Sequence, residues 1–425
     1  MDLFFDLAVV GLMFFAPLAW GSNENWAMGL ISAGGIGLLA LRLMVDAWKR
    51  EVRIPRAWIY APLLLFLAFS ALQHSVENNS TTKYLLLAAS YVSIVLLVHM
   101  GFRSRFEVKL LIISIFILGV FEGLYGLVQY FGQSDYIWDF RKTAILGVAS
   151  GTLINRNHYA LLMNLCICAG FGFLFYISLQ LLRGQPLSLR MLLTDRGIDK
   201  LGWIFLLLTM MGLALIFSMS RMGIAAMFFS LGTMMVAGQA ARRKRASALA
   251  LALFVATCGI AAYAGLDLVL ARFERTNLDT DRLPLWEDAW KMIRQHPVTG
   301  QGLGTFQWTY PAYETVDPDS PALYAHNDYL QALAEVGIIG LVLLLAALVL
   351  AYRTALGNLF RSEDSLARGI GMGTLGALTA IALQETTDFG LYIPGVAILA
   401  AVLVGLNLRA KRLEQDTDWH GPSRI

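Results

Sequence analysis

The sequence predicts an all-α polytopic membrane protein, and three observations lead to this prediction. Of its 425 residues, 57% are hydrophobic and only 15% are charged, whereas about a quarter of the residues of a soluble domain are charged. Apolar runs recur along the chain, and each is long enough for an α-helix to cross a bilayer. These runs do not alternate between apolar and polar residues, as the strands of a membrane β-barrel would.

About twelve of these runs are expected to be transmembrane helices, and together they form one integral membrane domain over residues 1–425. Their expected limits, in order, are 3–20, 26–46, 56–74, 84–102, 109–131, 157–181, 201–219, 222–240, 246–270, 335–352, 369–386 and 388–408.

The distribution of basic residues predicts the orientation. If the N-terminus is cytoplasmic, 23 of the 33 Lys and Arg fall in cytoplasmic segments, and the reverse orientation would invert this bias. Both termini are therefore expected in the cytoplasm. The run Arg242–Arg245 is then interpreted as a topology anchor and not as a nucleic-acid patch, so no nucleic acid is expected as a partner.

The segment 271–334, between the ninth and tenth spans, is a long polar stretch that this orientation places outside the cytoplasm. Within it, the residues from Arg282 to Gln295 have a helical period with one broad apolar face, which predicts an amphipathic helix. Pro297 then ends this helix. The alternating glycines of Gly300–Gly304 predict a tight turn or a close approach of two backbones, because a nucleotide-binding loop would follow a strand.

Several arginines and one histidine are expected on this same outer face. Arg221 lies at the turn between two spans, where a charge is costly unless it is paired or faces water. Taken one at a time, Arg221, Arg282 and Arg294 also fit ordinary interface or surface arginines, and His326 fits a satisfied polar group. Together they indicate a site for a phosphorylated substrate, because the guanidinium fork binds phosphate oxygens at two points. Since no acidic cluster has metal-ligand spacing, the site is expected to need neither a metal nor a cofactor.

Six segments of the chain resemble the O-antigen ligase and polymerase superfamily of bacterial envelope glycosyltransferases. They are Gly151–Ala160, Ser218–Gly223, Arg282–Trp286, His296–Gly302, Ala325–Gln331 and Glu335–Gly340. The most specific is Ala325–Gln331, whose sequence AHNDYLQ leads directly into the next span. The long outer loop late in the chain also agrees with this resemblance.

The resemblance implies a glycosyltransferase of the bacterial inner membrane with its active site at the periplasmic face. The donor would be an oligosaccharide on undecaprenyl pyrophosphate, and the acceptor a second lipid-linked repeat or lipid A–core, both presented by membrane lipid. By motif, His326 would be the general base, and Arg221 and Arg282 would bind the pyrophosphate. Arg156, Asn157, Asn327 and Tyr329 stand in the matching segments and are candidate substrate contacts. Two further candidates rest on position alone: Arg294, which has no firm counterpart in the family, and Asp388, at the junction of the last two spans.

Histidine suits this role because it can accept the proton of an attacking hydroxyl close to neutral pH. Direct attack on the anomeric carbon predicts inversion and no covalent enzyme intermediate. Polymerase and ligase both remain open, and the segment Gln384–Pro394 resembles the version found in exopolysaccharide polymerases. A peptidoglycan-type polymerase and a lipid-linked glycan transporter are further alternatives, although a transporter usually carries its polar groups at mid-membrane.

Overall fold

The computed structural model describes residues 2–51, 57–182, 198–241, 244–263, 278–315 and 322–413. The long helices are α1 (Asp2–Leu18), α2 (Asn25–Trp48), α3 (Tyr60–Leu72), α4 (Asn78–Met100), α5 (Arg105–Phe131), α6 (Arg156–Leu182), α8 (Ile198–Phe217), α9 (Arg221–Ala240), α10 (Lys244–Tyr263), α12 (Leu278–Gln295), α14 (Asp328–Phe360), α15 (Ser365–Gln384) and α16 (Pro394–Ala410). The short elements are α13 (Phe306–Thr309), the 3-10 turns η1 (Trp20–Ser22), η2 (Tyr310–Ala312) and η3 (Gly390–Tyr392), and the strands β1 (Tyr136–Ile137) and β2 (Phe140–Arg141).

The chain is mostly helical, as the sequence predicts, and a helix lies in each of the twelve expected ranges. Among the described residues, eight helices are long and apolar enough to cross a membrane: α2, α4, α5, α6, α8, α9, α14 and α15. α3, α16 and the part of α10 from Leu251 to Ile260 are apolar but shorter. The number of spans therefore stays a prediction. Arg242 and Arg243 of the basic run lie outside the described residues.

Several expected boundaries differ from the observed helix limits, including the starts of the tenth and the last helix. The tenth helix, α14, begins at Asp328 and not at 335, because the side chain of Asn327 caps its first turn. The last helix, α16, begins at Pro394 and not at 388, with proline in the first turn where its missing N–H costs nothing. The strands β1 and β2 form a small antiparallel hairpin within this mostly helical fold.

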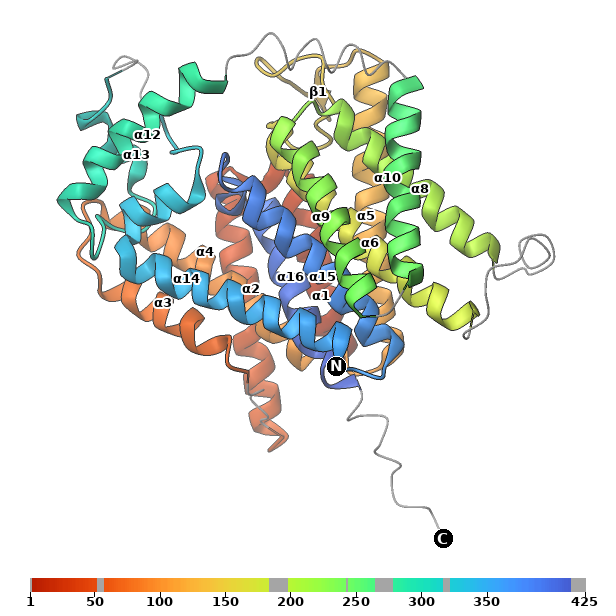
Figure 1. Ribbon diagram of the computed structural model, residues 1–425. Helices are drawn as coiled ribbons and strands as arrows, with labels where there is room; N and C mark the ends of the chain where they lie inside the picture. Colours follow the sequence, from red (N-terminus) through yellow and green to blue (C-terminus); the bar gives the residue numbers. More distant parts are fainter. Residues whose placement is uncertain are drawn as a thin grey trace.

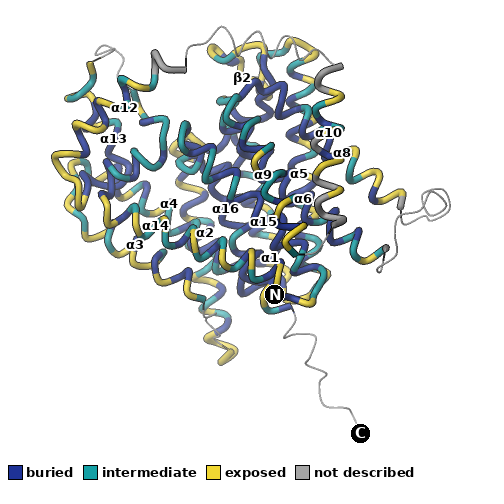
Figure 2. The backbone as a smooth tube through the Cα atoms, in the orientation of Figure 1, coloured by how far each residue is buried: buried dark blue, intermediate teal, exposed yellow. Residues whose placement is uncertain are grey.

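α6 and α15 form the centre of the bundle, and they are the most enclosed of the long apolar helices. α15 packs against α6, α9, α14 and α16. In Figure 2, α15 and α16 are largely dark blue, whereas α3 carries much exposed surface. The C-terminal end of α15 is therefore held in place by the helices packed around it.

A separate layer, here called the cap, consists of the described residues 278–315 and 322–327. Figure 1 shows its helices α12 and α13 together at one side of the molecule, next to α14. The predicted amphipathic helix is confirmed, since α12 covers Leu278–Gln295. Its buried face (Leu285, Ala289, Met292 and Ile293) packs on Phe306, Tyr310, Ala325 and Ala334 and forms a second small core.

The cap joins the bundle where the glycine run crosses α14. Gly337 interrupts α14 with φ 61° and ψ −170°, and the amides of Ile338 and Ile339 bond instead to the carbonyls of Pro297 and Val298. A Cβ on Gly337 would lie 2.3 Å from the oxygen of Val298, and a Cβ on Gly300 would lie 2.4 Å from that of Glu335. The expected close backbone approach is therefore confirmed, and it permits only glycine at both positions.

Candidate functional site

His326 is held in a strained backbone conformation just before α14. Its φ is 49°, which is unusual for a residue other than glycine. On one side, Ala325 is fixed by hydrogen bonds: its amide donates to Gln331 Oε1 at 3.0 Å, and its carbonyl accepts from Trp286 Nε1 at 3.0 Å. On the other side, Asn327 Oδ1 accepts the amides of Tyr329 and Leu330, both at 3.1 Å. Such strain persists only where the surroundings impose it, and it is common at active sites.

Asp388 lies beneath His326 and beside a second histidine. Its Oδ1 is 3.9 Å from His326 Nδ1 and 3.8 Å from His158 Nε2. Asp388 is only 1% exposed, and neither carboxylate oxygen accepts a hydrogen bond from any residue that the structure describes. Burial of a carboxylate that accepts no hydrogen bond is costly in free energy. A positive charge on a neighbouring histidine offsets this cost, so the arrangement suits a histidine that gains a proton during a reaction.

The ring of His326 is open to the surroundings on the side away from Asp388. Its side chain is 36% exposed, while its Nδ1 is buried and faces the carboxylate. An aromatic wall (Tyr84, Tyr324 and Phe389) holds the ring in place. Phe389 meets His326 edge-on at 4.8 Å and His158 at 4.6 Å, and Tyr324 stacks on Phe389 at 4.1 Å. The hydroxyls of Tyr84 and Tyr324 are 3.3 Å apart.

Arg282 reaches this centre from the cap. Its Nη1 donates to the carbonyl of Thr387 at 2.5 Å, directly before Asp388 in the chain. Arg294 lies on the same helix but is exposed in its last turn. Twelve residues of helix separate the two arginines by about 18 Å, so the structure does not bring Arg294 to the site.

Arg221 and Asn157 are brought together through the starts of two helices. Ser220 caps α9, whose first residue is Arg221, and the Ser220 hydroxyl donates to Asn157 Oδ1 at 2.9 Å. Gln384, at the end of α15, donates to the carbonyl of Asn157 at 2.7 Å. Arg156 is the first residue of α6, two positions before His158.

Three helices thus begin around the end of α15: α6, α9 and α14. The start of α14 is tied to the same place, because the amide of Asp328 donates to the carbonyl of Glu385 at 2.9 Å. Tyr329 anchors the first turn of α14 further, since its hydroxyl donates to the carbonyl of Ala382 at 2.9 Å. Helix N-termini carry partial positive charge, so their convergence favours an anion here.

Glu335 is a buried residue whose role the sequence reasoning missed. One of its carboxylate oxygens accepts the amide of Gly304 at 2.6 Å and the hydroxyl of Tyr392 at 2.6 Å. The other accepts the amide of Phe306 at 3.2 Å and the side chain of Gln331 at 3.2 Å. Glu335 therefore joins the cap to α14, and because both of its carboxylate oxygens accept hydrogen bonds, its role is structural. An acid inside an otherwise apolar span was the signal that could have drawn attention to it.

Among the residues that the structure describes, no group of three or more His, Cys, Asp or Glu has the arrangement of a metal site. The groups gathered at the centre are His326 and His158, the buried carboxyl groups of Asp328, Glu385 and Asp388, and the arginines and helix starts around them. His158, near the start of α6, is a second histidine that the structure places against Asp388.

A protein-family model described as O-antigen ligase matches residues 205–345. This stretch runs from α8 into α14 and contains Arg221, Arg282 and His326. The resemblance to the O-antigen ligase and polymerase superfamily is thereby confirmed over that part of the chain. His158 and Asp388 lie outside the matched stretch. No curated protein matches the chain.

Proposed function

We propose that this protein transfers an oligosaccharide from undecaprenyl pyrophosphate to an acceptor hydroxyl, and that it does so to polymerise the repeat units of a surface polysaccharide. The observation that carries the proposal is the approach of His326 Nδ1 to the buried carboxylate of Asp388 at 3.9 Å, where neither carboxylate oxygen accepts a hydrogen bond from the described residues. A histidine backed in this way is a general base, and Arg221 and Arg282 supply the cations that a departing pyrophosphate requires.

The proposed reaction is a single displacement at the anomeric carbon. The acceptor oxygen forms a bond to that carbon, and the bond from the carbon to the pyrophosphate oxygen breaks on the opposite face. The hydroxyl proton passes to Nε2 of His326, and Asp388 stabilises the resulting imidazolium through Nδ1. Undecaprenyl pyrophosphate leaves with the bonding electron pair, and the product has inverted configuration.

The charge that grows on the leaving pyrophosphate is stabilised by Arg221, Arg282 and the starts of α6, α9 and α14. Fixed guanidinium groups and helix dipoles need no reorganisation as the charge develops, so the reaction proceeds without a metal or another cofactor. Arg156 and Asn157 are assigned to the same anion. Asn327 and Tyr329 act on the substrate indirectly, through the position of His326.

The proposed location is the bacterial inner membrane, with the active site at the periplasmic face. Support comes from the excess of Lys and Arg in segments assigned to the cytoplasm, which favours twelve spans with both termini inside. The cap then belongs to the extracytoplasmic segment 271–334. Residues 271–277 and 316–321 of that segment lie outside the described residues.

Ligation of the glycan to lipid A–core is the second candidate, and the description of the matching family as O-antigen ligase favours it. Both reactions use the same donor and the same base, and they differ only in the acceptor. The segment Gln384–Pro394, which carries Asp388, supports the polymerase through its resemblance to exopolysaccharide polymerases.

The test is transfer by the purified protein from a defined undecaprenyl-pyrophosphate oligosaccharide without nucleotide sugar. One reaction offers lipid A–core as acceptor, and the other offers only further lipid-linked repeat. A ladder of lengthened lipid-linked chains is expected, and it should disappear in His326→Ala. A core-linked product would instead show that the protein is a ligase.

The matched control is His296→Ala, which removes an exposed histidine at the end of α12. It should transfer at the rate of the unchanged protein. Full activity of His326→Ala would refute the assignment of the base, and flux of donor across the membrane without transfer would support a transporter.

A further inference from the structure

A groove of about 1020 Å³ lies between α2, α4 and α13, outside the centre described above. Its walls are two helical stripes, one on α2 from Asn25 to Gly37 and the other on α4 from Asn79 to Leu86. The stripe on α2 is about 18 Å long, which exceeds half the thickness of the hydrocarbon core. The groove is thus long enough to receive one lipid chain from the headgroup level to mid-membrane.

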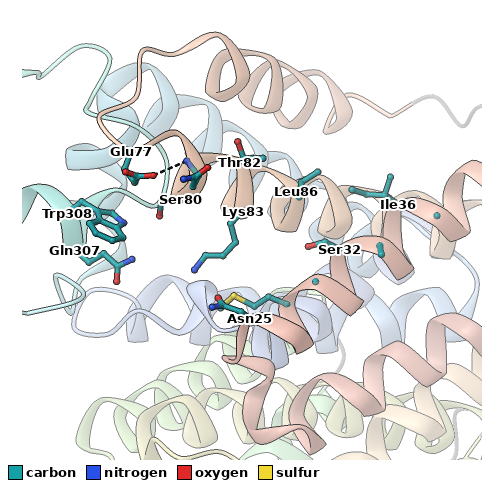
Figure 3. A pocket seen from close by; sticks show the side chains of 15 residues that line it. Asn25, Ser32, Ile36, Glu77, Ser80, Thr82, Lys83, Leu86, Gln307 and Trp308 are labelled. Atoms are coloured by element: carbon teal, nitrogen blue, oxygen red, sulfur yellow. Dashed lines mark hydrogen bonds between the residues drawn. The ribbon is translucent and has the colours of Figure 1, made fainter.

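The end of the groove nearest the cap is polar. Figure 3 shows Lys83 extending from α4 into the space between Asn25 of α2 and Gln307 and Trp308 of α13. Glu77 also lines this end, but its Oε1 accepts the amide of Asn79 at 3.1 Å. Both α2 and α4 begin here, so their partial positive ends add to the charge of Lys83 and favour a phosphate.

The rest of the groove is lined mainly by small and apolar residues. Its lining on α2 includes Gly29, Ala33 and Gly37, which are spaced four residues apart and therefore lie on one face of the helix. A Cβ on Gly29 or Gly37 would meet no atom within 4 Å, so the space above these residues is empty. A single strip between two helices fits one linear chain, whereas a glycolipid with several acyl chains needs a broader surface.

The polar end adjoins the proposed catalytic centre through the aromatic wall. Lys83 Nζ lies 4.9 Å from the ring of Tyr84, whose hydroxyl is 3.3 Å from that of Tyr324. Tyr324 stacks on Phe389, which contacts His326. A glycan attached to a phosphate at Lys83 would therefore begin only a few side chains from the proposed base.

We propose that this groove binds the isoprenoid chain and the phosphate of the acceptor, a second lipid-linked glycan. The inference rests on the proposed function, because a polymerase must hold two prenyl-linked substrates at once. Lys83, Asn25 and Gln307 bind the phosphate, and the strip of Gly29, Ala33 and Gly37 receives the chain. The arginines on the other side of the aromatic wall remain available to the donor pyrophosphate.

The test is photolabelling of the purified full-length protein with farnesyl phosphate that carries a diazirine on its chain. Labelled peptides are expected from α2 and α4. In the double variant Gly29→Leu, Gly37→Leu, the new side chains start at positions where an added Cβ meets no atom within 4 Å, and labelling in the groove should fall at least tenfold. The matched control is Gly232→Leu on α9, whose Cβ also meets no atom within 4 Å; it should label as the unchanged protein does.

Lys83→Ala should weaken labelling severalfold, and excess phosphatidylglycerol should not compete. Labelling that maps elsewhere, or that persists in the double variant, would overturn the proposal. Equal competition by phosphatidylglycerol would also overturn it and would assign the groove to ordinary phospholipid.

Two readouts separate this proposal from the proposed function. His326→Ala should keep the label on α2 and α4 while chain extension is lost, whereas the double leucine variant should lose both. Chain extension that survives in the double variant would overturn the acceptor assignment alone. Chain extension that survives in His326→Ala would refute the proposed base whatever the labelling shows.

Discussion

Substitution of Asp388 by asparagine tests the centre of the proposed chemistry. The change keeps the size and shape of a side chain that is 1% exposed, and it removes the negative charge that faces His326 and His158. Because both carboxylate oxygens of Asp388 accept no hydrogen bond from described residues, the substitution breaks no existing contact of that kind. The fold should therefore survive, and the effect should fall on the proton transfer.

The size of the effect follows from the distance between the two groups. A full charge on His326 Nδ1, 3.9 Å from Asp388 Oδ1, is stabilised by about 4 kcal/mol at an effective dielectric constant of about 20. Loss of that stabilisation in the transition state corresponds to about a thousandfold fall in rate. The asparagine dipole retains part of the interaction, so we expect kcat to fall by about a hundredfold to a thousandfold, with KM for the donor nearly unchanged.

The assay is the rate of chain extension by the purified variant under saturating donor, followed across pH. Asp288→Asn is the matched control, because Asp288 is also 1% exposed but lies in the cap, where it binds Lys291 and Thr315. Its kcat should equal that of the unchanged protein at neutral pH. A kcat within threefold of normal for Asp388→Asn would refute the role of this carboxylate, and a large rise in KM with constant kcat would reassign Asp388 to substrate binding.

Three further predictions concern the arginines, the metal and the cap. Arg221→Lys should lower kcat/KM at least a hundredfold if pyrophosphate is held at two points, because lysine keeps the charge but lacks the guanidinium fork. The control Arg294→Lys should leave kcat/KM unchanged. Normal turnover of Arg221→Lys would leave Arg221 only a general electrostatic role. Chelator should leave transfer unchanged, and inhibition that Mg²⁺ or Mn²⁺ reverses would reveal a metal. Burial raises the pKa of Asp288, but hydrogen bonds from Lys291 and Thr315 outweigh burial and hold this pKa below its ordinary value of 3.8. The carboxylate therefore stabilises the fold above about pH 4 and loses this effect as the pH falls further. Asp288→Asn should thus reduce the free energy of unfolding by about 1–3 kcal/mol at pH 7 and by less at pH 3; equal reductions at both would contradict the assignment.

The helices could be predicted from sequence because burial in a bilayer requires long apolar runs. A hydropathy window cannot detect where such a run ends when polar residues continue the helix, and for this reason the start of α14 was missed. His326, Asn327 and Asp328 were read as loop, although Asn327 is a typical capping residue. The same limit applies to α16, where the residues before Pro394 are apolar enough to imitate a span but form a connection instead.

The candidate site could be predicted only in part. His326 and Arg282 stand in motifs, so their grouping followed from resemblance. The approach of His158 to Asp388 depends on how α6 packs against α15, and no local pattern records such a contact between distant segments. Arg294 was placed at the site because it is close to Arg282 in the sequence. Along a straight helix, however, twelve residues separate the two by about 18 Å.

During biosynthesis, the site cannot form before the chain has been made as far as Phe389. Asp388 lies against both His158 and His326, and it follows both of them in the chain. A partly inserted chain would already possess both histidines, Arg221 and Arg282, but no carboxylate between the two rings. Under the proposed function, a nascent chain that has not yet reached Asp388 should not transfer sugar.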